Sequence, residues 1–70
     1  MKYVYVIEKA PDGSFSAFVP DLPGCTTSGE TAEEVRRNIA DAVASYIDSL
    51  REHNEAIPAP TSTADVVEAA

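Results

Sequence analysis

The side chains best suited to chemistry in this chain are few and scattered. Cys25 is the only cysteine and His53 the only histidine among the 70 residues. A nucleophilic thiol needs a neighbouring base, and none lies near Cys25 in the sequence, so we interpret Cys25 as a small core residue. His53 falls near the end of a predicted helix, where an imidazole commonly bonds free carbonyl groups. Neither residue predicts catalysis.

The other polar candidates are better explained by turns. Asp12 and Asp21 stand in Pro- and Gly-containing segments, where a carboxylate serves local hydrogen bonds. The serines lack a Gly-x-Ser-x-Gly elbow, and the 3 glycines are too scattered for a phosphate-binding loop. With a single histidine, no metal site is predicted. We therefore expect no enzyme, no cofactor and no bound metal.

Length and charge limit the functional classes further. A chain of 70 residues forms one domain with a small core, and its lone cysteine cannot close an internal disulfide. Self-association is the remaining way to add stability. The net charge of -7 would repel phosphates, which argues against direct nucleic-acid binding and favours a basic partner. The alternative is that the charge only keeps the surface solvated.

The N-terminus predicts a cytoplasmic protein. It becomes charged too early for a signal peptide, and no apolar run approaches the roughly 18 residues of a membrane span. A lone thiol also fits a reducing compartment.

Two strands joined by a tight turn are predicted first. Residues 2–9 and 14–19 are rich in residues that favour strands, and Pro11-Asp12-Gly13 between them predicts a three-residue hairpin loop with a bulge at Gly13. Ala10 opposite Ser14 would then pair Lys9 with Phe15, Ile7 with Ala17 and Tyr5 with Val19. In this register Tyr3, Tyr5, Ile7, Phe15, Ala17 and Val19 share the more apolar face, which we expect to line the core.

A short third strand and a long helix follow. Residues 20–24 form a rigid, irregular connection, and residues 25–28 predict the third strand. Thr31 and Glu34 have the spacing of a capping box, with reciprocal bonds expected between them. Apolar residues then recur with a 3.6-residue period from Val35 to Leu50, which predicts an amphipathic helix over about residues 32–53.

The end of the chain leaves two possibilities open. Ile57-Pro58-Ala59-Pro60 is predicted to stop the helix and continue in extended form. Residues 65–68 then form either a fourth edge strand or a frayed tail. The predicted fold class is α+β, in the order β-β-β-α with a possible final β, and with the helix on one face of an antiparallel sheet.

The face without the helix is the candidate functional site. A single helix covers one side of such a sheet, and the other side presents Val4, Val6 and Phe18. Uncovered apolar patches on a small domain usually mark an interaction surface. We therefore predict that these three residues contact a partner, a second copy of the chain, or both. The alternative is that Lys2, Glu8 and the tyrosines keep this face soluble by themselves.

Two motifs at a characteristic spacing carry a family resemblance. Phe15-Ser16-Ala17-Phe18-Val19-Pro20-Asp21-Leu22-Pro23-Gly24-Cys25 followed by Gly29-Glu30-Thr31-Ala32-Glu33-Glu34-Val35 resembles the HicB antitoxin family, over about residues 2–50 and more loosely to residue 67. The resemblance implies a β-β-β-α-β domain that neutralises a small basic HicA-type ribonuclease by occluding its active site, and that forms dimers or larger assemblies.

The resemblance also defines what we do not expect. Many members of that family carry a C-terminal DNA-binding domain, whereas residues 1–70 account for a single HicB-like domain. We therefore do not predict that this chain alone binds an operator and represses its own transcription. No catalytic residue of the family is assigned to this sequence. The alternative function is a homo-oligomeric scaffold or regulatory module that binds another protein or a small ligand and has no toxin partner.

Overall fold

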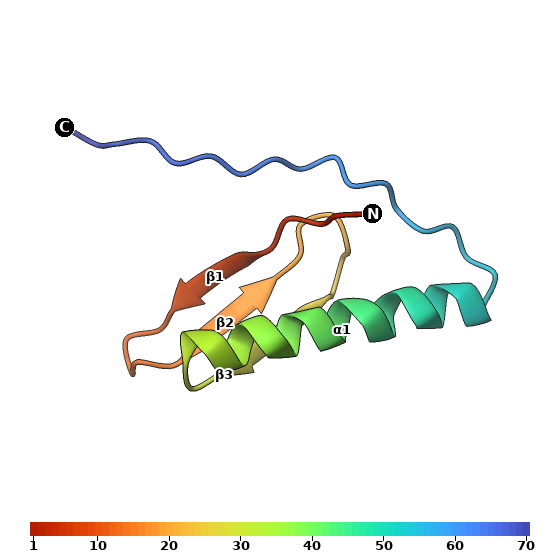
Figure 1. The fold of residues 1–70 in the computed structure, drawn as a ribbon, viewed down its shortest axis with the longest axis horizontal. Helices are drawn as coiled ribbons and strands as arrows, with labels where there is room; N and C mark the ends of the chain where they lie inside the picture. The colour runs from red at the N-terminus through yellow and green to blue at the C-terminus, as the bar shows by residue number, and fades with distance from the viewer.

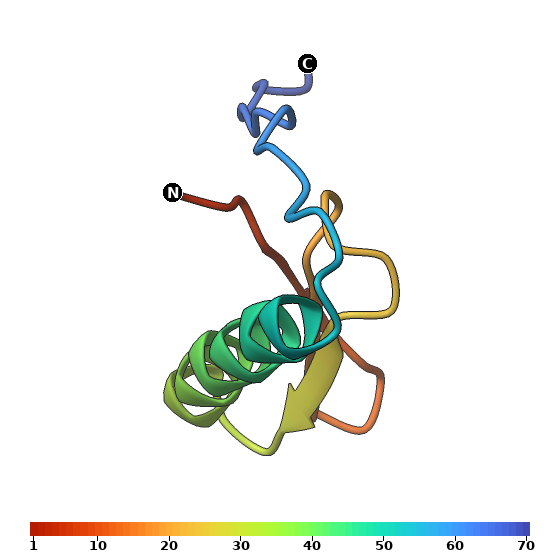
Figure 2. The same ribbon diagram turned by 90° about the vertical axis from the view of Figure 1, so that its right-hand side faces the viewer.

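The computed structural model describes all 70 residues and contains three strands followed by one helix (Figure 1). Strand β1 spans Val6–Lys9, β2 spans Phe15–Phe18, β3 spans Thr26–Gly29, and helix α1 spans Ala32–Glu52. The strands form one antiparallel sheet in the order β1-β2-β3, and α1 lies across one of its faces (Figures 1 and 2). The predicted α+β class and the position of the helix are confirmed.

The hairpin between β1 and β2 has the predicted turn. The amide of Ala10 donates to the Ser14 carbonyl at 2.8 Å, and that of Gly13 donates to Ala10 at 2.9 Å. Gly13 has φ +91°, a conformation that glycine adopts without steric cost. Asp12 accepts from both the amide and the hydroxyl of Ser14, at 2.9 and 2.6 Å. These bonds to the ionised form lower the pKa of Asp12, with the hydroxyl contributing most.

The predicted register is confirmed where the two strands pair. Lys9 lies opposite Phe15 and Ile7 opposite Ala17. The expected pair of Tyr5 and Val19 is not formed, because β1 begins at Val6. Val19 already belongs to the loop that leads to β3, where its amide donates to the Cys25 carbonyl at 3.1 Å.

That loop contributes more to the core than its sequence predicted. Leu22 is fully buried, and the amides of Leu22 and Cys25 bond back to Val19 and Leu22 at 3.1 and 3.0 Å. The connection is therefore folded inwards around one leucine. Strand β3 starts one residue later than predicted, since the backbone of Cys25 is used inside this loop.

Gly29 ends β3 where the sheet meets the start of the helix. A Cβ atom at this position would lie 2.9 Å from the backbone nitrogen of Val35, closer than a side chain tolerates. Because Gly29 has no side chain, the end of β3 can pack closely against the first turn of α1. The helix packs more extensively on β3 than on the other strands.

Both ends of α1 are capped by local bonds. The Thr31 hydroxyl accepts from the amide of Glu34 at 3.1 Å, so one half of the predicted capping box is formed. The reciprocal bond, from the Thr31 amide to the Glu34 carboxylate, is not formed. At the other end Asn54 adopts φ +56°, and Glu55 donates to the Leu50 carbonyl at 2.8 Å. The helix therefore ends at Glu52, within one residue of the predicted end. The left-handed cap at Asn54 ends it, rather than residues 57–60, to which the prediction attributed the stop.

The core lies between the helix and one face of the sheet. Its fully buried members come from β2, the loop and the first half of α1, and they are Ala17, Val19, Leu22, Cys25, Val35 and Ile39. Partly buried apolar side chains surround them, namely Tyr3, Ile7, Phe15, Ala42, Val43, Tyr46 and Ile47. The predicted inner face is therefore confirmed, except that Tyr5 is 40% exposed.

No fourth strand forms within the chain, so of the two possibilities left open for residues 65–68 the edge strand is not the one observed. The segment after α1 is extended, and its course is fixed near Ser62 by hydrogen bonds to Asp21. Beyond that point it runs on the β1 side of the sheet, clear of the strands and without pairing (Figure 1). Val66 and Val67 are 100% and 89% exposed. The extended segment is held by polar bonds at its start rather than by strand pairing.

Candidate partner-binding site

The sheet face opposite the helix carries a row of residues across all three strands, and this row is apolar in β1 and β2. Val6 in β1 lies directly opposite Phe18 in β2, and Phe18 lies opposite Thr26 in β3. Directly opposite residues of paired strands point to the same side of the sheet. Phe18 is 36% exposed although it is a large aromatic residue, and Val6 is half-buried. The structure thus brings Val6 and Phe18 together, as their sequence positions predicted.

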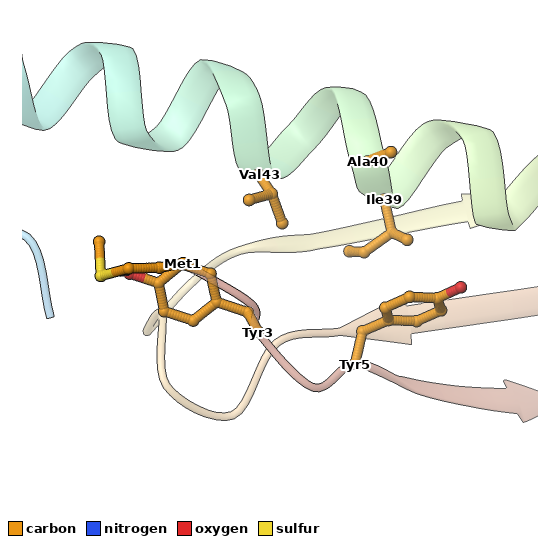
Figure 3. Close-up of a pocket in the computed structure, with 6 residues that line it drawn as sticks. All are labelled: Met1, Tyr3, Tyr5, Ile39, Ala40 and Val43. Atoms are coloured by element: carbon orange, nitrogen blue, oxygen red, sulfur yellow. Dashed lines mark hydrogen bonds between the residues drawn. The ribbon is translucent and has the colours of Figure 1, made fainter. Parts of the chain in front are cut away.

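Val4 extends this row along the N-terminal segment. Tyr3 and Tyr5 point towards α1 in Figure 3, so Val4 between them points to the opposite side. Val4 is half-buried and is not part of the core cluster. All three predicted contact residues therefore lie on the face that the helix leaves open. We call Val4, Val6 and Phe18 the outer apolar patch.

A polar row lies beside the outer apolar patch. Glu8 is opposite Ser16, and Ser16 is opposite Ser28, with all three side chains exposed. The face therefore divides into an apolar half and a hydrophilic half. An apolar contact area flanked by hydrogen-bonding groups is the usual composition of a protein interface.

A second apolar surface was not predicted from the sequence. A groove of about 260 Å³ lies between the N-terminal segment and α1 (Figure 3). Only apolar and aromatic residues line it, namely Met1, Tyr3, Tyr5, Ile39, Ala40 and Val43. Tyr3 and Tyr5 form one wall and the helix forms the other. Tyr5 was assigned to the core, but it lies at the open side of this groove.

Asp21 has a role that its position in a turn did not reveal. Its carboxylate accepts the amides of Thr61 and Ser62, each at 3.0 Å, and their hydroxyls at 3.0 and 2.9 Å. These four bonds, of which the amide of Ser62 contributes most, hold the pKa of Asp21 below its ordinary value of 3.8. We call this arrangement the Asp21 clamp. The only feature of the sequence that could have indicated this arrangement is the pair Thr61-Ser62, which offers two hydroxyls directly after Pro58 and Pro60.

The residues first considered for catalysis are separated in the structure. Cys25 is buried in the core, and burial raises the pKa of its thiol, which disfavours the nucleophilic thiolate. His53 is exposed at the far end of α1, where its Nδ1 donates to the Ser49 carbonyl at 2.8 Å. That bond confirms the predicted helix-end role. The structure does not assemble Cys25 and His53 into one site.

The structure contains neither a cluster of metal-binding side chains nor a membrane-spanning helix. No three histidine, cysteine, aspartate or glutamate side chains gather closely enough to hold a metal ion. The one helix, α1, lacks the long apolar stretch that crossing a membrane requires.

The chain matches a known family over nearly all of its length. The model of the HicB-like antitoxins of bacterial toxin–antitoxin systems matches residues 3–70. The match includes the hairpin, the Asp21 loop, the helix and the extended C-terminal segment.

Individual relatives agree with this match. A UPF0150 protein of Thermoplasma acidophilum is 50% identical over 58 residues, which are 83% of this chain and 84% of the relative. A UPF0150 protein of Synechocystis is 41% identical over 56 residues, covering 80% and 71%. The antitoxin HicB of Escherichia coli K12 is 34% identical over 61 residues, which are 87% of this chain but 44% of that protein.

Proposed function

Because the chain belongs to the HicB-like antitoxin family, we propose that it binds a small basic HicA-type toxin and neutralises it by covering the toxin's active site. Such a toxin cleaves RNA, so its substrate-binding surface must attract phosphates. Neutralisation requires no chemistry from the antitoxin. It requires a surface that binds more tightly than RNA does and blocks access to the catalytic group.

The outer apolar patch is the contact surface we propose for this toxin. The observation that supports it most is the pairing of Val6 with Phe18, since an aromatic ring 36% exposed beside a valine lies on a face that no other element covers. A large aromatic residue at the centre of a patch is the typical anchor of a protein interface. The adjacent Ser16 and Ser28 supply hydroxyls that hydrogen-bond a partner at the rim.

The negative charge of this chain attracts a basic partner before the two proteins come into contact. The net charge of -7 comes from 12 acidic and 5 basic residues, and the exposed face of α1 carries several of the carboxylates. The attraction accelerates encounter with a basic protein, and the apolar patch then determines how long the complex lasts. The same negative charge repels RNA, so it hinders the toxin's substrate from approaching the complex.

Binding between purified proteins tests the proposal. The experiment requires a short basic protein encoded beside the gene for this chain, made as an inactive variant for calorimetry and as the active enzyme for RNA-cleavage assays. We expect a complex that weakens as salt increases, and RNA cleavage that stops when the two proteins are equimolar. No complex at low salt, or no such basic protein beside the gene, would contradict the proposal.

Variants on the two faces show which surface is used. Phe18→Ser with Val6→Thr keeps strand-compatible residues but removes the apolar contact, and we expect affinity to fall at least ~10-fold. Ala44→Ser on the exposed side of α1 is the matched control and should leave affinity unchanged. The thermal midpoint of both variants verifies folding. Equal affinities of the two variants would exclude the outer apolar patch as the toxin contact.

A further inference from the structure

A side chain of α1 bonds the backbone of β3, the last strand of the sheet. The strand order β1-β2-β3 leaves β3 with β2 on one side and no strand on the other. A free strand edge presents unpaired amides and carbonyls to which a further strand can bond. Here the Nδ2 amide of Asn38 donates to the Ser28 carbonyl at 2.9 Å. No other side chain bonds the backbone of a strand in this structure.

The pairing of β1 with β2 determines which way the Ser28 carbonyl points. Antiparallel partners alternate between pairs that exchange backbone bonds and pairs whose backbone groups point away from each other. The Ala10 amide donates to the Ser14 carbonyl at 2.8 Å, so Glu8 and Ser16, the next such pair along the ladder, also exchange bonds. The backbone groups of Ser16 therefore point to β1. Ser28 lies opposite Ser16, so its own groups point away from β2.

The loop between β2 and β3 gives the same direction independently. The Val19 amide donates to the Cys25 carbonyl at 3.1 Å, which makes these two residues a bonded pair. Alternation from this pair again makes Ser16 and Ser28 a pair without mutual bonds. The Ser28 carbonyl therefore lies on the free edge of β3.

Asn38 occupies the position that an added strand would need. A separation of 2.9 Å is that of an ordinary backbone bond, so Nδ2 of Asn38 lies where the amide nitrogen of another strand would lie. The helix can place Asn38 there because it packs more extensively on β3 than on the other strands and approaches it closely at Gly29. An added strand would have to displace Asn38 before it could bond Ser28.

The other edge of the sheet has no such side chain. By the same alternation Ile7 and Lys9 of β1 turn their backbone groups away from β2. No side-chain bond reaches either residue's backbone, and the helix packs towards the opposite side of the sheet. The two edges of this sheet therefore differ, and only the β3 edge is capped.

We propose that Asn38 is an edge-capping residue that prevents strands of other molecules from adding to β3. Proteins commonly block exposed strand edges, because an open edge pairs with whatever extended chain it meets. The competing role for the same bond is to hold α1 on the sheet, and the two roles predict different behaviour when the bond is removed. The proposal does not rest on the antitoxin function, since every measurement below uses this chain alone.

Sedimentation velocity over a series of concentrations separates the two roles. Asn38→Ala uncaps the edge, and we expect the apparent association constant to rise at least ~10-fold above that of the unchanged chain. Asn38→Asp also loses the donor, but a charge at an edge itself hinders strand addition, so no rise is expected. Ser45→Ala, on the exposed side of the same helix, is the matched control. If Asn38→Ala associates no more than the control, the bond only holds the helix and the proposal is wrong.

Amide hydrogen exchange locates the association. The amides of Thr26 and Ser28 point away from β2, so they should exchange rapidly in the unchanged chain. In the associated Asn38→Ala variant we expect both to be protected at least ~10-fold more strongly. Association without this protection would mean that another surface pairs. Strong protection of Ser28 in the unchanged chain would show that strands add in spite of Asn38, which also contradicts the proposal.

A second substitution distinguishes strand addition from partial unfolding. Ser28→Pro removes an amide that only an added strand would use, and proline is tolerated in an edge strand where its nitrogen faces solvent. Combined with Asn38→Ala, it should return the association constant to that of the unchanged chain. Thermal midpoints verify that each variant is folded. If the double variant associates as strongly as Asn38→Ala alone, exposed core residues rather than the β3 edge are responsible, and Asn38 does not act as an edge cap.

Discussion

The carboxylate of Asp21 binds both the amide and the hydroxyl of Ser62, which lies 41 residues further along the chain. Thr61 makes the same pair of bonds to the same carboxylate. A second long-range bond, from the Tyr3 hydroxyl to the Pro58 carbonyl at 2.5 Å, joins the N-terminal segment to the same stretch. The loop between β2 and β3 therefore positions the extended C-terminal segment, although neither belongs to a regular element.

Replacing Asp21 should release that segment. Asp21→Ala removes both carboxylate oxygens that accept the four bonds, so we expect the amides of Thr61 and Ser62 to exchange with solvent at rates close to those of an unfolded peptide. Hydrogen exchange followed by NMR measures this. Asp12→Ala is the control, since Asp12 bonds only Ser14 and should leave residues 61 and 62 protected. Unchanged protection in the Asp21 variant would show that other contacts hold the segment.

Acid should open the same clamp. The pKa of Asp21 is lower in the folded protein than its ordinary value of 3.8, because Ser62 and Thr61 bond the ionised form. The stability it contributes is therefore complete above about pH 4 and is lost as the pH falls through the folded-state pKa. NMR shifts of Ser62 followed from pH 7 to pH 2 should change only below pH 4. A transition centred above pH 4 would mean that the carboxylate is not favoured in the fold.

Gly29 should tolerate no side chain. A Cβ atom there meets the backbone nitrogen of Val35 at 2.9 Å and its Cα at 3.2 Å, and backbone cannot rotate away as a side chain does. Gly29→Ala should therefore cost about 1–3 kcal/mol, which for a domain of this size lowers the thermal midpoint by roughly 4–8 °C per kcal/mol. Ser28→Ala, at the exposed neighbouring position, should change it little. Equal midpoints would show that β3 and α1 separate at negligible cost.

Features specified by neighbouring residues were predictable from the sequence. Pro11-Asp12-Gly13 determined the turn and hence the register, since shifting it by one residue would reverse both faces. The spacing of apolar residues predicted α1, and Thr31 predicted its start. From the register alone it followed that Val6 and Phe18 share the open face, which the structure confirms. Whether a partner binds there stays a prediction.

Features that depend on distant residues were not predictable in this way. The Asp21 clamp joins positions about 40 residues apart, so no local pattern indicates it. The end of α1 was predicted to within one residue, but its cause, the left-handed conformation of Asn54, was not, because the prolines that follow gave the stronger local signal. Residues 65–68 have the composition of a strand, but of the two possibilities left open for them the edge strand does not form. Local propensity favours a strand there and does not by itself bring about pairing.

Leu22 should contribute more to stability than any other residue of its loop. It is fully buried between the sheet and α1, with Val35 and Ile39 in the same cluster. Leu22→Ala should cost about 2–5 kcal/mol, which approaches the entire stability of a domain this small, so the variant should be largely unfolded at 25 °C. Leu22→Val keeps part of the side chain and should give a measurable, smaller loss in urea denaturation. Leu50→Ala is the control for removing the same atoms from a half-exposed position near the end of α1, and it should cost clearly less. If Leu22→Ala and Leu50→Ala were equally stable, the buried leucine would not anchor the β2–β3 loop, and the position of Asp21 within that loop would need another explanation.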